Sequence, residues 1–138
     1  MLNSNEPQKI RVVGYCRGNS NSIENQMRSI REYVDNSDDM ELLDIYADYK
    51  CSGLNPNRAC YLQMLDIIQN HKADMVVCTD MARIFRHPVG MSGFLHTLHQ
   101  LGASCMFLNN PDMSMTEYMG LFDPVLIQGG ESYAEERI

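Results

Sequence analysis

The chain has 138 residues, 44% of them hydrophobic, and a formal net charge of −7. This length suits one globular domain with a substantial core, and the acidic balance argues against non-specific nucleic-acid binding by the whole domain. No apolar run is long enough to span a bilayer and no signal-peptide core follows the first residue, so we expect a cytoplasmic protein with no membrane partner.

Residues 1–9 are polar and predict a flexible N-terminal tail. The segment 10–26 then predicts a buried strand, a polar turn and the start of a helix, because a nearly continuous apolar run is followed by turn-forming residues. Ser22 is expected to cap this helix, which ends near Asp35.

Strands and helices alternate through the rest of the chain. The predicted elements are a strand at 41–48, a helix at 58–70, a strand at 74–80, a helix at 89–101 that stops at Gly102, and a strand at 103–108. This order predicts an α/β domain over 10–116, with a mostly parallel central sheet of about four to five strands and helices on both faces. Residues 117–138 begin another helical stretch.

The sequence contains neither a phosphate-binding loop nor a dinucleotide-binding or hydrolase motif. The five cysteines include no CxxC pair, and three of them lie in apolar runs, which predicts buried, reduced thiols. His96 and His99 have no carboxylate at a metal-binding spacing. We therefore expect no metal and no cofactor.

Polar side chains follow several of the predicted strands. They are Arg17, Asn19 and Ser20, then Gln26, the segment 48–58, and the pair Arg83 and Arg86. Because the carboxyl ends of parallel strands share one edge, we expect these guanidiniums to meet there and to hold a phosphate. A serine nucleophile at that edge needs its proton removed and its leaving group protonated. The alternative is that Arg83 and Arg86 are surface residues at a helix start.

The order of these motifs resembles the catalytic domain of the serine recombinases, the resolvase/invertase family. The family's opening Tyr-x-Arg-x-Ser and Ser-x-x-x-Gln motifs resemble residues 15–26. Its later motifs resemble Asp48, Ser52, Gly53 and Arg58, then Asp74 with 82–86, and finally 112–115 and 134–137. The resemblance spans about residues 10–138.

The resemblance implies an enzyme in which a serine attacks a DNA phosphodiester, leaving a 5′ phosphoserine link and a free 3′ hydroxyl. Four subunits then exchange strands and religate without metal or nucleotide. It assigns phosphate binding to Arg17, Arg58, Arg83 and Arg86, and phosphate positioning to Gln26. It also implies DNA as a partner, a homodimer and tetramer in the full-length protein, and a truncated dimerisation helix beginning at 117–138.

Two positions depart from the family pattern. Counting from Arg17, the nucleophile position holds Asn19, whose amide cannot form a phosphoenzyme, so the adjacent Ser20 becomes the candidate nucleophile. Ala82 stands where the family has a carboxylate before its arginine pair, and we expect Arg83 to be less well oriented as a result.

Two other classes of function stay open. The departures fit a catalytically impaired resolvase-like module that acts through protein contacts. A receiver-like or flavodoxin-like signalling domain is a third hypothesis, in which Asp80 would be one member of an acidic cluster. The acidic pair that such a cluster needs after the first strand is missing from the sequence.

Overall fold

A computed structural model of the chain describes residues 8–50 and 58–122. Four strands and four α-helices alternate along these residues, with a short 3₁₀ helix η1 between the third strand and the third α-helix. In chain order they are β1 (Ile10–Gly18), α1 (Ser20–Asp35), β2 (Met40–Tyr49), α2 (Ala59–Gln69), β3 (Met75–Cys78), η1 (Met81–Arg83), α3 (Pro88–Gln100), β4 (Ser104–Phe107) and α4 (Met115–Gly120).

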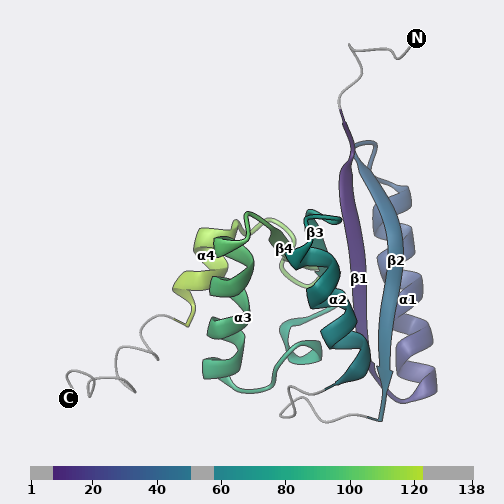
Figure 1. The fold of residues 1–138 in the computed structure, drawn as a ribbon. Coiled ribbons are helices and arrows are strands. Elements are labelled where there is room, and N and C mark those ends of the chain that lie inside the picture. The colour runs from purple at the N-terminus through teal and green to yellow at the C-terminus, as the bar shows by residue number, and fades with distance from the viewer. Residues whose placement is uncertain (1–7, 51–57, 123–138) are drawn as a thin grey trace, which may run out of the picture.

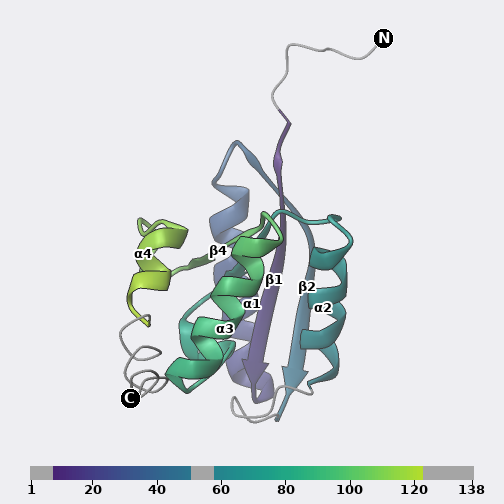
Figure 2. The ribbon, with the colours of Figure 1, turned by 60° about the vertical axis from the view of Figure 1, so that its left-hand side comes forward.

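The strands form one sheet in the order β2-β1-β3-β4, and every neighbouring pair is parallel. The longest pairing joins β1 to β2, from Ile10 opposite Met40 to Gly18 opposite Tyr49. Because all four strands run the same way, their carboxyl ends lie at one edge, as the arrowheads of β1 and β2 show in Figure 2. The predicted α/β class with a parallel sheet is confirmed.

Side chains of the central strand alternate between the two faces of the sheet. Val12 and Cys16 belong to a core beneath α1, whereas Val13 and Tyr15 belong to a larger core beneath α2 and α3. Figure 1 shows α1 on one face of the sheet and α2 and α3 on the other. The strand is therefore buried on both faces, which explains why its sequence is a nearly continuous apolar run.

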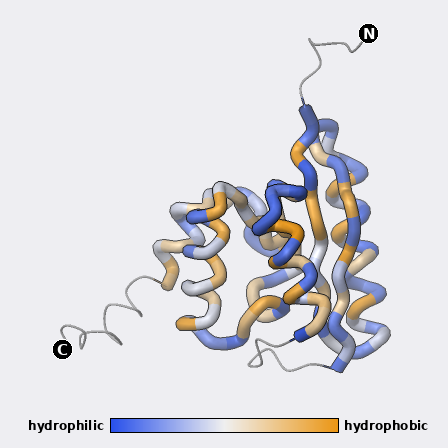
Figure 3. The backbone as a smooth tube through the Cα atoms, in the orientation of Figure 1, coloured by the Kyte–Doolittle hydropathy of each residue, from blue (hydrophilic) through white to orange (hydrophobic). Residues whose placement is uncertain are grey.

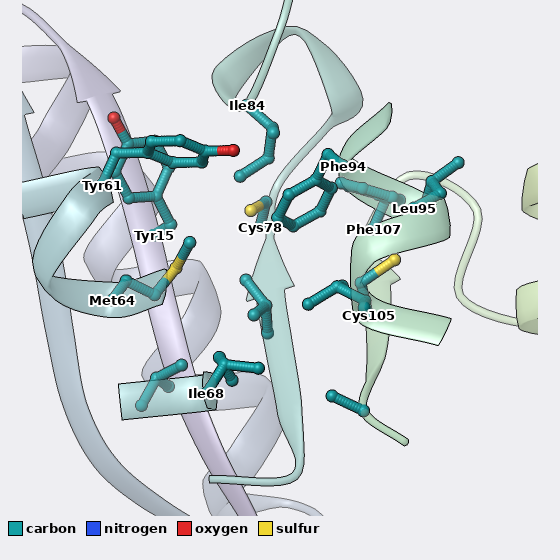
Figure 4. Close-up of a cluster of buried hydrophobic side chains, with 14 of the residues drawn as sticks. Tyr15, Tyr61, Met64, Ile68, Cys78, Ile84, Phe94, Leu95, Cys105 and Phe107 are labelled. Atoms are coloured by element: carbon teal, nitrogen blue, oxygen red, sulfur yellow. The ribbon is translucent and has the colours of Figure 1, made fainter. Parts of the chain in front are cut away.

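The larger core is rich in aromatic and sulfur-containing side chains (Figure 4). Tyr61 of α2 makes edge-on contacts with Tyr15 and Phe85, at centroid distances of 5.8 and 5.6 Å. Hydrophobic residues in Figure 3 lie along β1, while α1 alternates between hydrophobic and hydrophilic residues as an amphipathic helix does. The core thus joins the sheet to the loop after β3, where Phe85 lies.

The cysteines follow the prediction where the structure describes them. Cys16, Cys78 and Cys105 are free and buried, and Cys60 is partly exposed. Burial raises the pKa of Cys16 and of Cys105 to about 12, so these thiols remain protonated. Cys51 lies outside the described residues.

The start of α1 corrects one prediction. Asn19, not Ser22, is the N-cap: its Oδ1 accepts the Ser22 amide N–H at 2.8 Å. The Ser22 hydroxyl instead accepts a bond from the Gln26 side chain at 2.8 Å. An asparagine is as good an N-cap as a serine, so local sequence alone did not separate the two positions.

The remaining helix boundaries agree with the predictions to within two residues. Gly102, at φ +76°, follows the end of α3 as expected. Of the predicted helical stretch 117–138, the first residues belong to α4, which begins at Met115 with a capping box made by Ser114 and Glu117. Residues 123–138 and most of the predicted tail 1–9 lie outside the described part of the chain.

Candidate active site

A cleft of about 650 Å³ opens at the carboxyl edge of the sheet. It is lined by the end of β1, the 3₁₀ helix η1, the loop after it, the start of α3 and a residue beyond α4. The lining residues are Arg17, Asp80, Met81, Ala82, Arg83, Phe85, Arg86, His87, Pro88, Met91 and Phe122. Three arginines therefore face one carboxylate in this cleft, although the chain as a whole is acidic.

Arg17 and Arg83 bind each other's backbone. Arg17 donates from Nε to the Arg83 carbonyl at 3.0 Å and from a terminal nitrogen to the Ala82 carbonyl at 2.6 Å. Arg83 donates in return to the Arg17 carbonyl at 3.0 Å. These bonds fix the end of β1 against η1, so the two guanidiniums keep one relative position.

Gln26 holds Arg17 from the other side. Its Oε1 accepts the Arg17 amide N–H at 3.1 Å, and its Nε2 donates to the Arg17 carbonyl at 3.0 Å. The Gln26 side chain is buried and does not line the cleft. Its amide bonds both backbone groups of Arg17, beyond the point where the pairing of β1 with β3 ends at Gly14, and it acts on the cleft through Arg17.

Arg58 lies beneath the cleft and does not line it. Its side chain is 1% exposed, and its guanidinium donates to the Arg83 carbonyl at 3.0 Å and to the Ile84 carbonyl. The guanidinium carbon also lies over the rings of Tyr61 and Phe85, at 4.6 and 5.1 Å from their centroids. Arg58 therefore supports the loop that carries the cleft arginines.

A buried carboxylate completes this support. Asp48, at the end of β2, accepts the backbone N–H groups of Cys60 and Tyr61 at 2.9 Å each and the Tyr15 hydroxyl at 2.8 Å. Tyr15 accepts a bond from Arg58 at 3.0 Å. Burial and the bond to Asp48 raise the pKa of Tyr15, so its phenol stays protonated and keeps donating. One network thus links β1, β2, α2 and the cleft loop.

The arginines repel one another. Burial lowers the pKa of Arg17, and the positive charges of Arg86 and Arg58 lower it further. Arg86 is exposed at the rim, and no hydrogen bond joins its side chain to a described residue. An anion in the cleft would relieve this repulsion, and a phosphate has the charge and acceptor geometry to do so.

Arg83 has a carboxylate partner that the sequence motif did not predict. Its Nε lies 3.5 Å from an oxygen of Asp80, three residues earlier. Ala82 supplies no carboxylate, but Asp80 and the Arg17 carbonyl both contact the Arg83 side chain.

Neither candidate at the nucleophile position lines the cleft. Ser20 is the first residue of α1 and is exposed, and Asn19 uses its side chain as the N-cap. None of the described residues that line the cleft carries a hydroxyl or a thiol. Ser52 and Gly53 lie outside the described part of the chain.

Within residues 8–50 and 58–122, no group of three or more His, Cys, Asp or Glu side chains is arranged to hold a metal ion. In the same two segments, no helix has the length and apolar character needed to cross a bilayer.

Two polar residues of the cleft were not predicted as site residues from the sequence. Asp80 was considered only as a signalling carboxylate, and His87 was not considered at all. A usable signal existed for His87, since it precedes Pro88, and a proline at the first helical position marks the residue before it as the N-cap. Its contact with Phe85 and its place in the cleft depend on tertiary packing.

Residues 12–135 match the family described as "Resolvase, N terminal domain". The match covers most of the chain, which therefore belongs to the resolvase family and contains its N-terminal domain. No curated protein matches the chain.

Solved structures with the same fold include the N-terminal catalytic domain of TP901-1 integrase, at 19% identity and a TM-score of 0.73, over 91% of this chain and 97% of that one. A resolvase family site-specific recombinase from Streptococcus pneumoniae matches at 17% identity and a TM-score of 0.74, over 94% and 93%. The C-terminal catalytic domain of ISC1926 TnpA, an IS607-like serine recombinase, matches at 20% and 0.67, over 92% and 85%.

Proposed function

We propose that this chain acts in site-specific DNA recombination and that its cleft holds a DNA phosphodiester. One observation carries the proposal: Arg17, Arg83 and Arg86 line a single cleft in an acidic domain, opposite one carboxylate. Guanidiniums placed in this way stabilise the charge that develops on a phosphate during substitution at phosphorus. Membership in the resolvase family supports DNA as the source of that phosphate.

The five candidate residues other than Ser20 divide into two roles. Arg86, exposed at the rim, contacts the phosphate first, and Arg17 and Arg83 face the cleft from its inner wall. Arg58 and Gln26 are positioning residues, since one holds the cleft loop and the other holds Arg17.

In the cleaving form of this function, Ser20 is the nucleophile. Its Oγ forms a bond to phosphorus as the bond to the 3′ oxygen breaks, so the DNA keeps a free 3′ hydroxyl and its 5′ phosphate is joined to the serine. The hydroxyl proton leaves the serine and a proton is delivered to the 3′ oxygen, which balances the step. Ser20 has to approach the arginines for this reaction, because it does not line the cleft in this structure.

A second candidate is a phosphate-binding module that does not cleave. It is favoured by the lack of any hydroxyl or thiol among the described cleft residues and by the use of Asn19 as a helix cap. Such a module would bind DNA phosphate and contribute to recombination through contacts with other subunits.

The binding proposal is tested by measuring the affinity of the chain for a short duplex over a range of salt concentrations. We expect affinity to fall with salt, and Arg86→Gln to weaken binding and reduce the slope by about 1. Arg28→Gln, at an exposed position on α1 away from the cleft, is the matched control. Equal losses in both variants would contradict the proposed site.

A nicked suicide duplex separates the two forms of the function. The cleaving form predicts a covalent DNA–protein product that is lost in Ser20→Ala and retained in Ser22→Ala. The duplexes should carry randomised sequence, and the attachment site should be read by mass spectrometry. Binding without any covalent product would support the non-cleaving module.

A further inference from the structure

His87 is a cleft residue with an assignable hydrogen-bonding state. It is the N-cap of α3, and its Nδ1 accepts the Gly90 amide N–H at 3.0 Å. A ring nitrogen that accepts a hydrogen bond carries no proton, so the neutral ring has its proton on Nε2. The cap therefore selects the tautomer in which Nε2 is a donor.

The Nε2–H group has no protein acceptor among the described residues. Among the described residues, the only buried side-chain nitrogen or oxygen atoms without a hydrogen bond are Ser92 Oγ and Arg83 Nε, which has only its ion-pair contact with Asp80. His87 Nε2 is not among them, so this atom is accessible to solvent. His87 is half-buried and lines the cleft with Arg83 and Arg86. Its free donor thus belongs to the same cavity as the guanidiniums.

The ring is held in place by close neighbours. Phe85 contacts it edge-on at a centroid distance of 5.7 Å. A Cβ atom at Gly90 would lie 2.7 Å from His87 Cε1 and 2.9 Å from Nε2, closer than real Cβ contacts. The glycine lets the imidazole lie flat against the first turn of α3, and the donor direction is fixed before any ligand binds.

We propose that His87 donates its Nε2–H to an oxygen of the phosphate held in the cleft. This inference rests on the proposed function and adds an uncharged donor to the three arginines. His87 therefore supplies direction to the bound phosphate, and the arginines supply the charge.

Loss of an uncharged donor should affect the salt dependence of binding differently from loss of an arginine. His87→Asn keeps an acceptor for the Gly90 amide at the N-cap, but its shorter side chain withdraws the donor. At pH 8 we expect it to weaken binding of a short duplex about 3- to 10-fold. The slope of affinity against salt should stay unchanged, because no counterion-releasing charge is lost.

A second measurement reads the ring directly. We expect the imidazole nitrogen shifts in NMR to report the Nε2–H tautomer in the free chain. Titration with the dinucleotide TpT should shift the His87 signal and leave those of His71 and His99 in place, since both are exposed and outside the cleft. His99→Asn is the matched control for affinity.

The outcomes distinguish the two claims. If Arg86→Gln weakens binding while His87→Asn does not, the cleft binds phosphate and the role of His87 is wrong. If His87→Asn lowers the salt slope, the ring binds as a cation and the uncharged-donor role is wrong. If neither variant weakens binding, the proposed function itself fails. Thermal unfolding of His87→Asn should match the wild type, which excludes a folding defect.

Discussion

The second and the penultimate residues of β1 are both arginines, and the two have different environments. Arg11, near the amino end of β1, is half-buried and forms a bidentate pair with Asp74, at 3.1 and 3.0 Å. Arg17, near the carboxyl end, is 3% exposed, and its guanidinium donates to the carbonyls of Ala82 and Arg83. The carboxylate raises the pKa of Arg11, whereas burial and neighbouring arginines lower that of Arg17.

The difference separates a structural arginine from one suited to ligand binding. The Asp74 carboxylate pairs directly with the positive charge of Arg11. Backbone carbonyls accept hydrogen bonds from Arg17, and the positive charges of Arg83 and Arg86 lie in the same cleft. The two ends of β1 thus differ in the groups that contact their arginines. A carboxylate contacts Arg11, whereas backbone carbonyls contact Arg17.

The largest expected effect comes from removing the buried support of the carboxyl edge. Arg58→Ala leaves the carbonyls of Arg83 and Ile84 without their donor and opens space between aromatic rings. We expect the free energy of unfolding to fall by about 3–5 kcal/mol, measured by urea denaturation. Arg31→Ala, at an exposed position on α1, should change it by less than about 0.5 kcal/mol. Similar values for the two variants would refute the supporting role.

Asp48→Asn should have the next largest effect. The asparagine keeps one acceptor oxygen, but its NH₂ group faces a group that donates a hydrogen bond to Asp48 in the wild type. That group is either the Tyr15 hydroxyl or a backbone N–H of α2. We expect a loss of about 1–3 kcal/mol in unfolding free energy. Asp66→Asn, at an exposed position on α2, is the control and should be close to neutral. If Asp48→Asn leaves the unfolding free energy unchanged, solvent replaces the hydrogen bonds that Asp48 accepts.

The comparison between the two ends also predicts different responses to DNA. Arg86→Gln should lower affinity for a short duplex about 3- to 10-fold and leave unfolding unchanged, because no described residue bonds to its side chain. Arg11→Gln should leave DNA affinity unchanged. Fluorescence anisotropy at fixed salt measures both, and a loss for Arg11→Gln would contradict the division of roles.

The smallest expected effect is at the amino end and depends on pH. The bonds from Arg11 lower the pKa of Asp74 below its ordinary 3.8. A carboxyl whose pKa is lower in the folded state stabilises the fold above its unfolded pKa, and that contribution is lost as pH falls through the folded pKa. Asp74→Asn should therefore be slightly less stable than wild type at pH 7. The difference should shrink as the pH falls below 3.8 and vanish once the pH is below the folded pKa of Asp74, and thermal unfolding across pH tests this.

The sequence predicted the order of elements because each element carries its own local signal. The two-sided apolar run of β1 and the helical spacing after it are visible without any tertiary information. The cap of α1 was misplaced because Asn19 and Ser22 are both good N-caps, and the choice depends on the Gln26 side chain taking the Ser22 hydroxyl.

The roles of the site residues were harder to predict because they depend on how deeply each side chain is buried. The prediction that Arg17, Arg83 and Arg86 lie at one edge of the sheet agrees with the structure, because the carboxyl ends of parallel strands share an edge. It could not show that Arg58 lies under the loop among aromatic rings, because those rings come from distant segments. The ion pair of Asp80 with Arg83 spans the short 3₁₀ helix η1, which was not predicted from the sequence.

The position of β1 in the sheet also bears on how the chain is made. Its first partner, β2, is synthesised soon after it, but residue 12 pairs on its other side with residue 75. Until β3 emerges from the ribosome, β1 presents an apolar strand with an open edge, and closing that edge requires a long loop. Nascent chains that stop before Cys78 should aggregate, whereas those that include β3 gain the partner that covers the strand.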